Sequence, residues 1–193
     1  MGVKMKKAIL LLSVILSIIF VTGCSKNNDI VGNNDDEILQ YLYKSDFMNA
    51  IGKDNITIVD TIYIDNSKVI GFLSNTGQGY LVYEKNKKGN YILTDNVAQG
   101  ITQGDLGVSH FICKYNLNNG LENSDNAYIV ISNGDTVSKV EISINGRIFN
   151  KSLKTGKPSM ILLKDMVPKS EYKDGVNFDC RYFDINNNEL KNE

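Results

Sequence analysis

His110 is the only histidine in the chain, and this limits the nucleophilic sites that the sequence can build. A Ser-His-Asp or Cys-His arrangement would have to include it. Its neighbour Ser109 is predicted to lie on the opposite strand face, because successive side chains of a strand point to opposite sides. No group of histidine, cysteine and carboxylate residues has the spacing of a transition-metal site. We therefore expect a binding protein without catalytic residues, metal or cofactor, with His110 at a surface or boundary.

Three short motifs match those of penicillin-binding proteins and class A β-lactamases, but their context differs. Residues 124–126 read Ser-Asp-Asn, residues 154–156 read Lys-Thr-Gly, and residues 170–173 read Ser-Glu-Tyr-Lys. In that family the Ser-x-x-Lys element comes first and opens a helix, whereas here it comes last and runs into Asp-Gly. The Lys-Thr-Gly element should lie on a strand, but the Gly-Lys-Pro at residues 156–158 predicts a turn. We therefore expect these matches to be coincidental.

Residues 184–188 read Asp-Ile-Asn-Asn-Asn and begin like a calcium loop, with oxygen ligands at alternate positions. Glu189 follows where an EF-hand needs glycine for its sharp turn. The segment therefore predicts a solvated turn and not a metal site.

The first 24 residues are organised like a secretory signal. Three lysines at positions 4, 6 and 7 precede an apolar run over residues 8–21, which ends in the small residues Thr22 and Gly23. A helix of 14 residues is about 21 Å long, well short of a hydrocarbon core of about 30 Å. We expect a cleaved signal peptide over residues 1–23 and not a membrane-spanning helix.

The tetrad Val21, Thr22, Gly23 and Cys24 resembles the lipobox of bacterial lipoproteins. The resemblance implies that signal peptidase II recognises the first three residues and cuts before Cys24, whose thiol carries a diacylglyceryl group. Two acyl chains anchor a protein stably, so the mature chain would stay on the extracytoplasmic face of the cell membrane. The alternative is an incidental thiol beside an ordinary cleavage site.

Removal of residues 1–23 leaves 170 residues and lowers the formal net charge from −1 to −4. This length fits one ordinary domain or two very small ones. A mildly acidic chain without a Lys/Arg cluster argues against nucleic acid as a partner. Abundant Asn, Lys and Ile are typical of a low-G+C Gram-positive bacterium.

Cys113 and Cys180 are the two cysteines left after Cys24. Each sits in a predicted strand, in the patterns Phe111-x-Cys113-x-Tyr115 and Phe178-x-Cys180-x-Tyr182, so both thiols should face apolar core. A disulfide outside the cytoplasm would close a long loop and contribute roughly 4 kcal/mol. Two separate buried thiols fit the same pattern.

The hydrophobic pattern predicts an α+β, mainly β fold. Residues 24–34 are polar and predict a flexible spacer. Apolar residues at helical spacing follow up to Gly52, after which four short strands lie between residues 56 and 94. Short turns between these strands imply antiparallel neighbours, so residues 35–115 are expected to form a helix packed on an antiparallel meander. Residues 95–109 predict an unusually long loop before a strand at residues 110–115.

Residues 116–126 are polar and are the expected boundary between two subdomains. Beyond them, residues 127–193 hold four or five short strands, including a hairpin signal at Asn145-Gly146. This part resembles a small immunoglobulin-like or fibronectin-like β-sandwich. For the hairpin, a two-residue loop would place Phe149 opposite Ile142 and Lys151 opposite Val140, which leaves the register open.

Two hypotheses for function follow. The first is a non-enzymatic, membrane-tethered module that binds a protein or wall component of the cell envelope. The second is a small-ligand (solute) binding lipoprotein, with a pocket between the two halves near residues 95–109.

Overall fold

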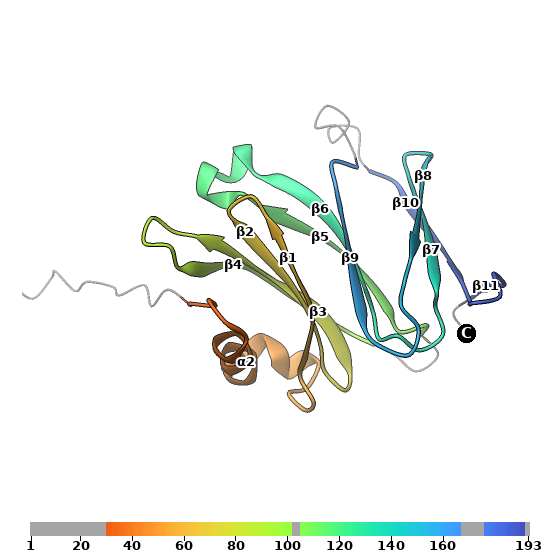
Figure 1. Cartoon of the computed structure of the whole chain (residues 1–193), viewed down its shortest axis with the longest axis horizontal. Helices are drawn as coiled ribbons and strands as arrows, with labels where there is room; N and C mark the ends of the chain where they lie inside the picture. Colours follow the sequence, from red (N-terminus) through yellow and green to blue (C-terminus); the bar gives the residue numbers. More distant parts are fainter. Residues whose placement is uncertain (1–29, 102–104, 167–175, 192–193) are drawn as a thin grey trace, which may run out of the picture.

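The computed structural model describes residues 30–101, 105–166 and 176–191, and this part of the chain is mainly β. One α-helix and three antiparallel sheets make up its architecture (Figure 1). The expected mainly β fold, with an N-terminal helix and antiparallel sheets, is confirmed. The helices are α2 (Asp35–Lys44) and the short 3-10 turns η1 (Asp46–Ala50), η2 (Leu117–Asn119) and η3 (Leu121–Asn123).

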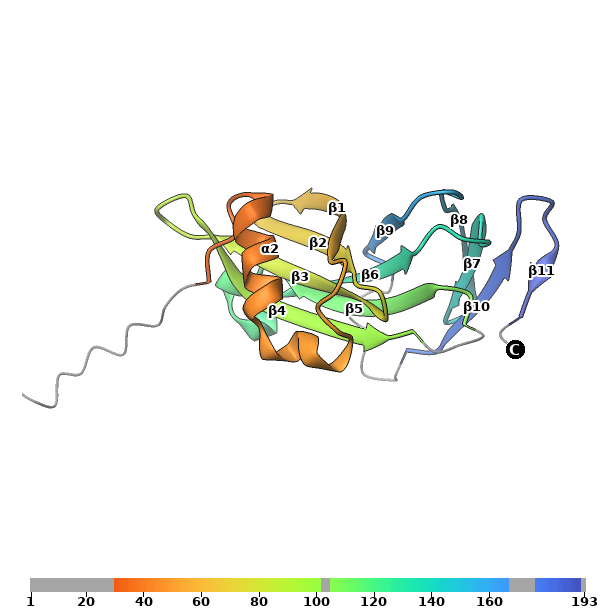
Figure 2. The same ribbon diagram turned by 90° about the horizontal axis from the view of Figure 1, so that it is seen from below.

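The meander sheet contains β1 (Thr57–Ile64), β2 (Ser67–Leu73), β3 (Gly77–Lys85) and β4 (Tyr91–Gly100), paired in this order. Helix α2 lies across its strands (Figure 2). The Asn34 side chain accepts a hydrogen bond from the Glu37 backbone N–H at 3.0 Å and so caps the start of the helix. Ser45 has an extended backbone, so the α-helix ends at Lys44 and not near Gly52 as expected. The 3-10 turn η1 continues the apolar face.

Residues 30–33 are fixed to the edge of β4, although the sequence predicts a flexible spacer up to residue 34. Leu93 N–H donates to the Ile30 carbonyl at 2.9 Å, and Gly32 N–H donates to the Tyr91 carbonyl at 3.0 Å. The buried ammonium of Lys68 donates to the Gly32 carbonyl and lies 4.8 Å from the Tyr91 ring centre. Burial lowers the pKa of Lys68, whereas the nearby carboxylates of the helix raise it. Residues 30–33 are therefore not part of a flexible spacer, and residues 24–29 lie outside the described residues.

The middle sheet contains β5 (Val108–Tyr115), β6 (Asp125–Ser132) and β9 (Ser159–Lys164), in the order β5-β6-β9. The expected subdomain boundary at residues 116–126 lies between two of its paired strands, because β5 pairs with β6 and not with the meander. The expected loop over residues 95–109 is shorter than predicted. Strand β4 continues to Gly100 because a β-bulge opposite Val82 keeps it paired with β3.

The outer sheet contains β7 (Lys139–Ile144), β8 (Arg147–Ser152), β10 (Phe178–Phe183) and β11 (Glu189–Leu190), in the order β11-β10-β7-β8. Its hairpin turn has positive φ at both Asn145 and Gly146, as the Asn-Gly signal predicts. The observed register places Ile142 opposite Phe149, and Val140 opposite Lys151. The two-residue loop register is thus the one that the strands adopt.

Three hydrophobic clusters give the order of the layers. The first packs α2 and η1 on the meander sheet through Ile38, Leu42, Ile70, Phe72 and Leu81. The second lies between the meander and middle sheets and includes Val69, Tyr80, Phe111, Cys113 and Ile129. The third lies between the middle and outer sheets and includes Tyr128, Val130, Val140, Ile142 and Leu163. The middle sheet is therefore buried on both faces, with α2 and the outer sheet at opposite ends of the molecule (Figure 1).

No helix among the described residues has the length and apolar character needed to cross a bilayer.

Candidate functional site

His110 lies between the middle and outer sheets, at the centre of a cluster of polar side chains. Its Nε2 is 2.6 Å from the hydroxyl oxygen of Tyr182, and its Nδ1 is 3.0 Å from the hydroxyl oxygen of Tyr128. Cys180 Sγ lies 3.4 Å from the Tyr128 hydroxyl and 3.9 Å from His110 Nδ1. The sequence pattern predicts His110 at a surface or boundary and gives no sign of this cluster. Strands that are 70 residues apart in the chain bring its members together.

All four side chains of this cluster are neutral at neutral pH. Burial lowers the pKa of His110 to about 4 and raises the pKa of Tyr182 to about 12. Burial also raises the pKa of Tyr128 and of the Cys180 thiol. A neutral imidazole has one donor and one acceptor nitrogen, so it donates to one tyrosine oxygen and accepts from the other. Since a protonated thiol is a poor nucleophile, the cluster forms a hydrogen-bond network and not an activated Cys-His pair.

An apolar cleft of about 270 Å³ opens on one side of Tyr128, between β5, β6 and β10. The rings of Tyr128 and Phe178 form one wall, stacked at 5.1 Å between ring centres with an interplanar angle of 10°. Ile112 borders the cleft with 53% of its surface exposed. The lining residues are Ile112, Lys114, Asn126, Ala127, Tyr128, Leu163, Met166, Val176 and Phe178.

A second cleft of about 240 Å³ opens on the other side of His110, and polar atoms line most of it. It lies where the end of β4 and residues 105–106 meet the beginning of β5, with Tyr182 from the outer sheet. The sequence predicts a small-ligand pocket in this region, between the two halves of the chain and near residues 95–109. His110 and Tyr182 both line this cleft, so the hydrogen-bond network separates the two clefts.

The two cysteines considered for a disulfide are free thiols in the structure. Cys113 is fully buried between the middle and meander sheets, whereas Cys180 packs between the middle and outer sheets. The middle sheet therefore separates the two sulfur atoms. This arrangement corresponds to the alternative of two separate buried thiols.

The penicillin-binding motifs are not assembled in the described part of the chain. Ser-Asp-Asn spans the beginning of β6, and Lys-Thr-Gly lies in the turn after β8. The residues of the Ser-x-x-Lys motif, 170–173, lie outside the described residues, as do Cys24 and the lipobox residues Val21, Thr22 and Gly23.

The carboxylate of Asp184 holds the predicted turn at residues 184–188. Asp184 accepts hydrogen bonds from the backbone N–H groups of Asn186 at 2.9 Å and Asn188 at 2.8 Å. A hydrogen bond from the Asn188 side chain at 2.9 Å, together with these backbone bonds, lowers the pKa of Asp184. Within the described ranges, no group of three or more His, Cys, Asp or Glu residues could hold a metal ion.

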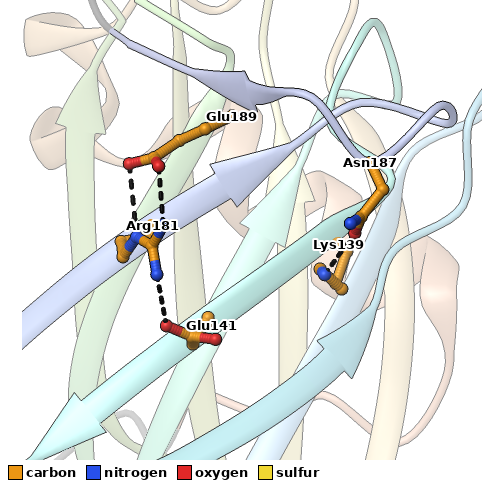
Figure 3. Close-up of polar contacts among 5 residues, drawn as sticks. All are labelled: Lys139, Glu141, Arg181, Asn187 and Glu189. Carbon is orange, nitrogen blue, oxygen red and sulfur yellow. Dashed lines mark hydrogen bonds and ion pairs between the residues drawn. The ribbon is translucent and has the colours of Figure 1, made fainter.

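The exposed face of the outer sheet carries charged pairs (Figure 3). Arg181 donates to Glu189 at 2.7 Å and to Glu141 at 3.1 Å, and so links β10 to both β11 and β7. Lys139 bonds to Asn187 in the neighbouring turn. Because Arg181 and Glu189 are exposed and Glu141 and Lys139 are only partly buried, these contacts contribute little to stability.

Comparisons with protein-family models, with curated proteins and with solved structures found no match to this chain.

Proposed function

We propose that this protein is a non-enzymatic, lipid-anchored binding module on the extracytoplasmic face of a bacterial cell membrane. The tetrad that ends in Cys24 supports the anchor, because a cysteine directly after small residues and an apolar run is the acceptor of a diacylglyceryl group in bacterial lipoproteins. Such a modification would hold the folded part close to the membrane. Five residues, 25–29, would separate the anchored cysteine from the segment paired with β4.

The binding domain is proposed to be an immunoglobulin-like sandwich of the middle and outer sheets. Three strands face four, and the chain crosses between the two sheets after β6, after β8 and after β9. Folds of this kind share such crossings between two antiparallel sheets. Under this proposal the sandwich begins with β5 at Val108 and not at residue 127, and α2 with the meander covers its first sheet.

The apolar cleft carries the proposal that this module binds a protein of the cell envelope. Pockets that enclose a whole drug-sized ligand measure roughly 300–1,000 Å³. A cleft of about 270 Å³ is below this range and suits a single large side chain of a partner. Protein interfaces commonly depend on such anchor side chains in desolvated pockets. The exposed Ile112 at its border would be covered when the partner binds.

The polar cleft supports the second candidate, a solute-binding lipoprotein. Its lining includes Gln99 and the hydroxyl of Tyr182, which keeps hydrogen-bonding capacity beyond its bond to His110 and can orient a polar ligand. A solute there would meet the hydrogen-bond network and not the aromatic wall. The two candidates therefore predict different contact residues on the same sandwich.

Site-specific photo-crosslinking in intact cells tests the proposal. Benzoylphenylalanine at position 112 should give a discrete crosslinked protein, because this position borders the apolar cleft. The matched control is position 148 on β8, where Ile148 is similarly exposed at 62% but lies away from both clefts. Equal crosslinking at both positions, or none at position 112, would contradict a partner site at the cleft.

A further inference from the structure

Lys114 and Asn126 form a polar end of the otherwise apolar cleft. They are direct cross-strand partners in the β5–β6 pair, so their side chains lie next to each other on the face toward β10. The other lining residues are aliphatic or aromatic, and none of the lining residues carries a carboxylate. The cleft thus has an apolar body with a single cation at its edge.

The charge of Lys114 is not used within the described part of the chain. Its side chain is exposed, and no ion pair joins it to a described carboxylate. Asp125, next to Asn126 in sequence, points to the opposite face of β6, where its carboxylate accepts from the Asn116 side chain at 3.0 Å. A partner carboxylate at the edge of the cleft would therefore meet an ammonium that is not paired with any of the described carboxylates.

The aromatic wall determines what the body of the cleft can accept. The stacked rings of Tyr128 and Phe178 present a flat apolar surface, and the Tyr128 hydroxyl points away to His110 and Cys180. With its hydroxyl already bonded, Tyr128 offers only its ring to a ligand. A large aliphatic or aromatic side chain would gain free energy there by removing its apolar surface from water.

We propose that the cleft selects a polypeptide segment in which Asp or Glu neighbours a large apolar side chain. The apolar side chain fills the space against Tyr128 and Phe178, and the carboxylate pairs with Lys114. This inference rests on the proposed function as a protein-binding module and names the chemistry of its partner. Charge complementarity at the edge of an interface mainly provides specificity, so Lys114 is assigned as a specificity-determining residue.

Selection from a phage-displayed random peptide library on the full-length chain in detergent tests the inference. The wild-type protein should enrich peptides with Phe, Leu, Trp or Met beside Asp or Glu. Lys114→Glu should enrich Lys or Arg beside the same apolar residues and should bind the wild-type peptides about three- to tenfold more weakly. Lys151→Glu, a charge reversal at an exposed position on β8, is the matched control and should select like the wild type.

A second pair of variants separates the two levels of the proposal. Ile112→Asp should abolish enrichment, whereas Ile148→Asp should not. If enriched apolar peptides depend on Ile112 but show no acidic preference, the role of Lys114 is wrong and the proposed function stands. If Ile112→Asp and wild type select the same peptides, both fail. Enrichment that appears only after residues 168–174 are replaced by a Gly-Ser linker would show that the chain's own segment occupies the cleft, and would overturn the proposal.

Discussion

His110 Nε2 lies 2.6 Å from the hydroxyl oxygen of Tyr182, and this hydrogen bond joins the middle sheet to the outer sheet. The other ring nitrogen is 3.0 Å from the hydroxyl of Tyr128, so both nitrogens of a partly buried imidazole are satisfied. Burial lowers the pKa of His110 to about 4, so the ring is neutral at pH 7 and one nitrogen donates while the other accepts. An uncharged histidine therefore lies between the middle and outer sheets.

This arrangement predicts that stability depends on pH through His110. Its pKa is lowered from 6.5 to about 4 in the folded state, so between these values the unfolded chain binds a proton that the folded chain does not. The free energy of unfolding should then fall as the pH decreases from 6.5 towards 4, by about 2 kcal/mol from this residue. Above about pH 7.5 the histidine is neutral in both states and contributes no pH dependence.

Urea unfolding at pH 7 and at pH 4.5 measures this effect. His110→Gln cannot titrate and should lose less stability than the wild type over the same interval. The pKa values of Tyr128, Tyr182 and Cys180 are raised, so these neighbours stay neutral throughout it. Identical pH dependence in the two proteins would show that His110 is not held neutral.

A second prediction concerns Glu84, a carboxylate with only 2% of its surface exposed. It accepts hydrogen bonds from the backbone N–H groups of Leu117 and Asn118, and so holds the connection between β5 and β6 on the meander sheet. In Glu84→Gln, one of the two carboxylate oxygens becomes an amide N–H₂ group, which cannot accept a hydrogen bond from a backbone N–H. The remaining oxygen is uncharged and is a weaker acceptor. We expect a loss of about 2–3 kcal/mol in the free energy of unfolding, because the backbone bonds to a charged acceptor are lost.

Chemical denaturation at pH 7 measures this loss. Glu122→Gln, the same change at an exposed position of that connection, is the control and should stay within about 0.5 kcal/mol of the wild type. Equal effects of the two substitutions would mean that the connection does not depend on Glu84.

The third prediction is that Cys113 and Cys180 remain reduced in the protein isolated from cells. They lie on opposite sides of the middle sheet, so a disulfide would require that sheet to be rearranged. Mass spectrometry after unfolding in iodoacetamide without reductant should find both residues alkylated. A disulfide-linked pair of peptides that contain Cys113 and Cys180 would contradict this prediction.

Local sequence signals account for much of the fold. Acidic residues after Asn34 predicted the start of α2, turn residues predicted the meander, and the Asn145-Gly146 pair predicted the hairpin. Each of these signals acts over a few residues, and the structure follows each of them. The end of α2 was missed because the apolar spacing continues through Ser45 into η1.

The same local signals do not predict which strands or sheets lie side by side when they are far apart in the sequence. The sequence separated β5 from β6 because the intervening segment is polar, whereas in the structure Glu84 and Ser67 bind that segment from the meander. The cluster around His110 was missed for a similar reason. Strand alternation places His110 and Tyr182 on definite faces of their own strands, but it does not tell which strand of another sheet each one faces.

The lipid anchor on Cys24 is the central claim. Detergent-phase partitioning of the protein extracted from whole cells tests it. Wild-type protein should enter the detergent phase with a mass that corresponds to a chain beginning at a diacylated Cys24. Cys24→Ala should instead be released to the medium or keep its signal peptide, whereas Cys180→Ala should partition like the wild type. A Cys24→Ala protein that is still processed and still enters the detergent phase would contradict the lipid anchor and the extracytoplasmic module proposed from it.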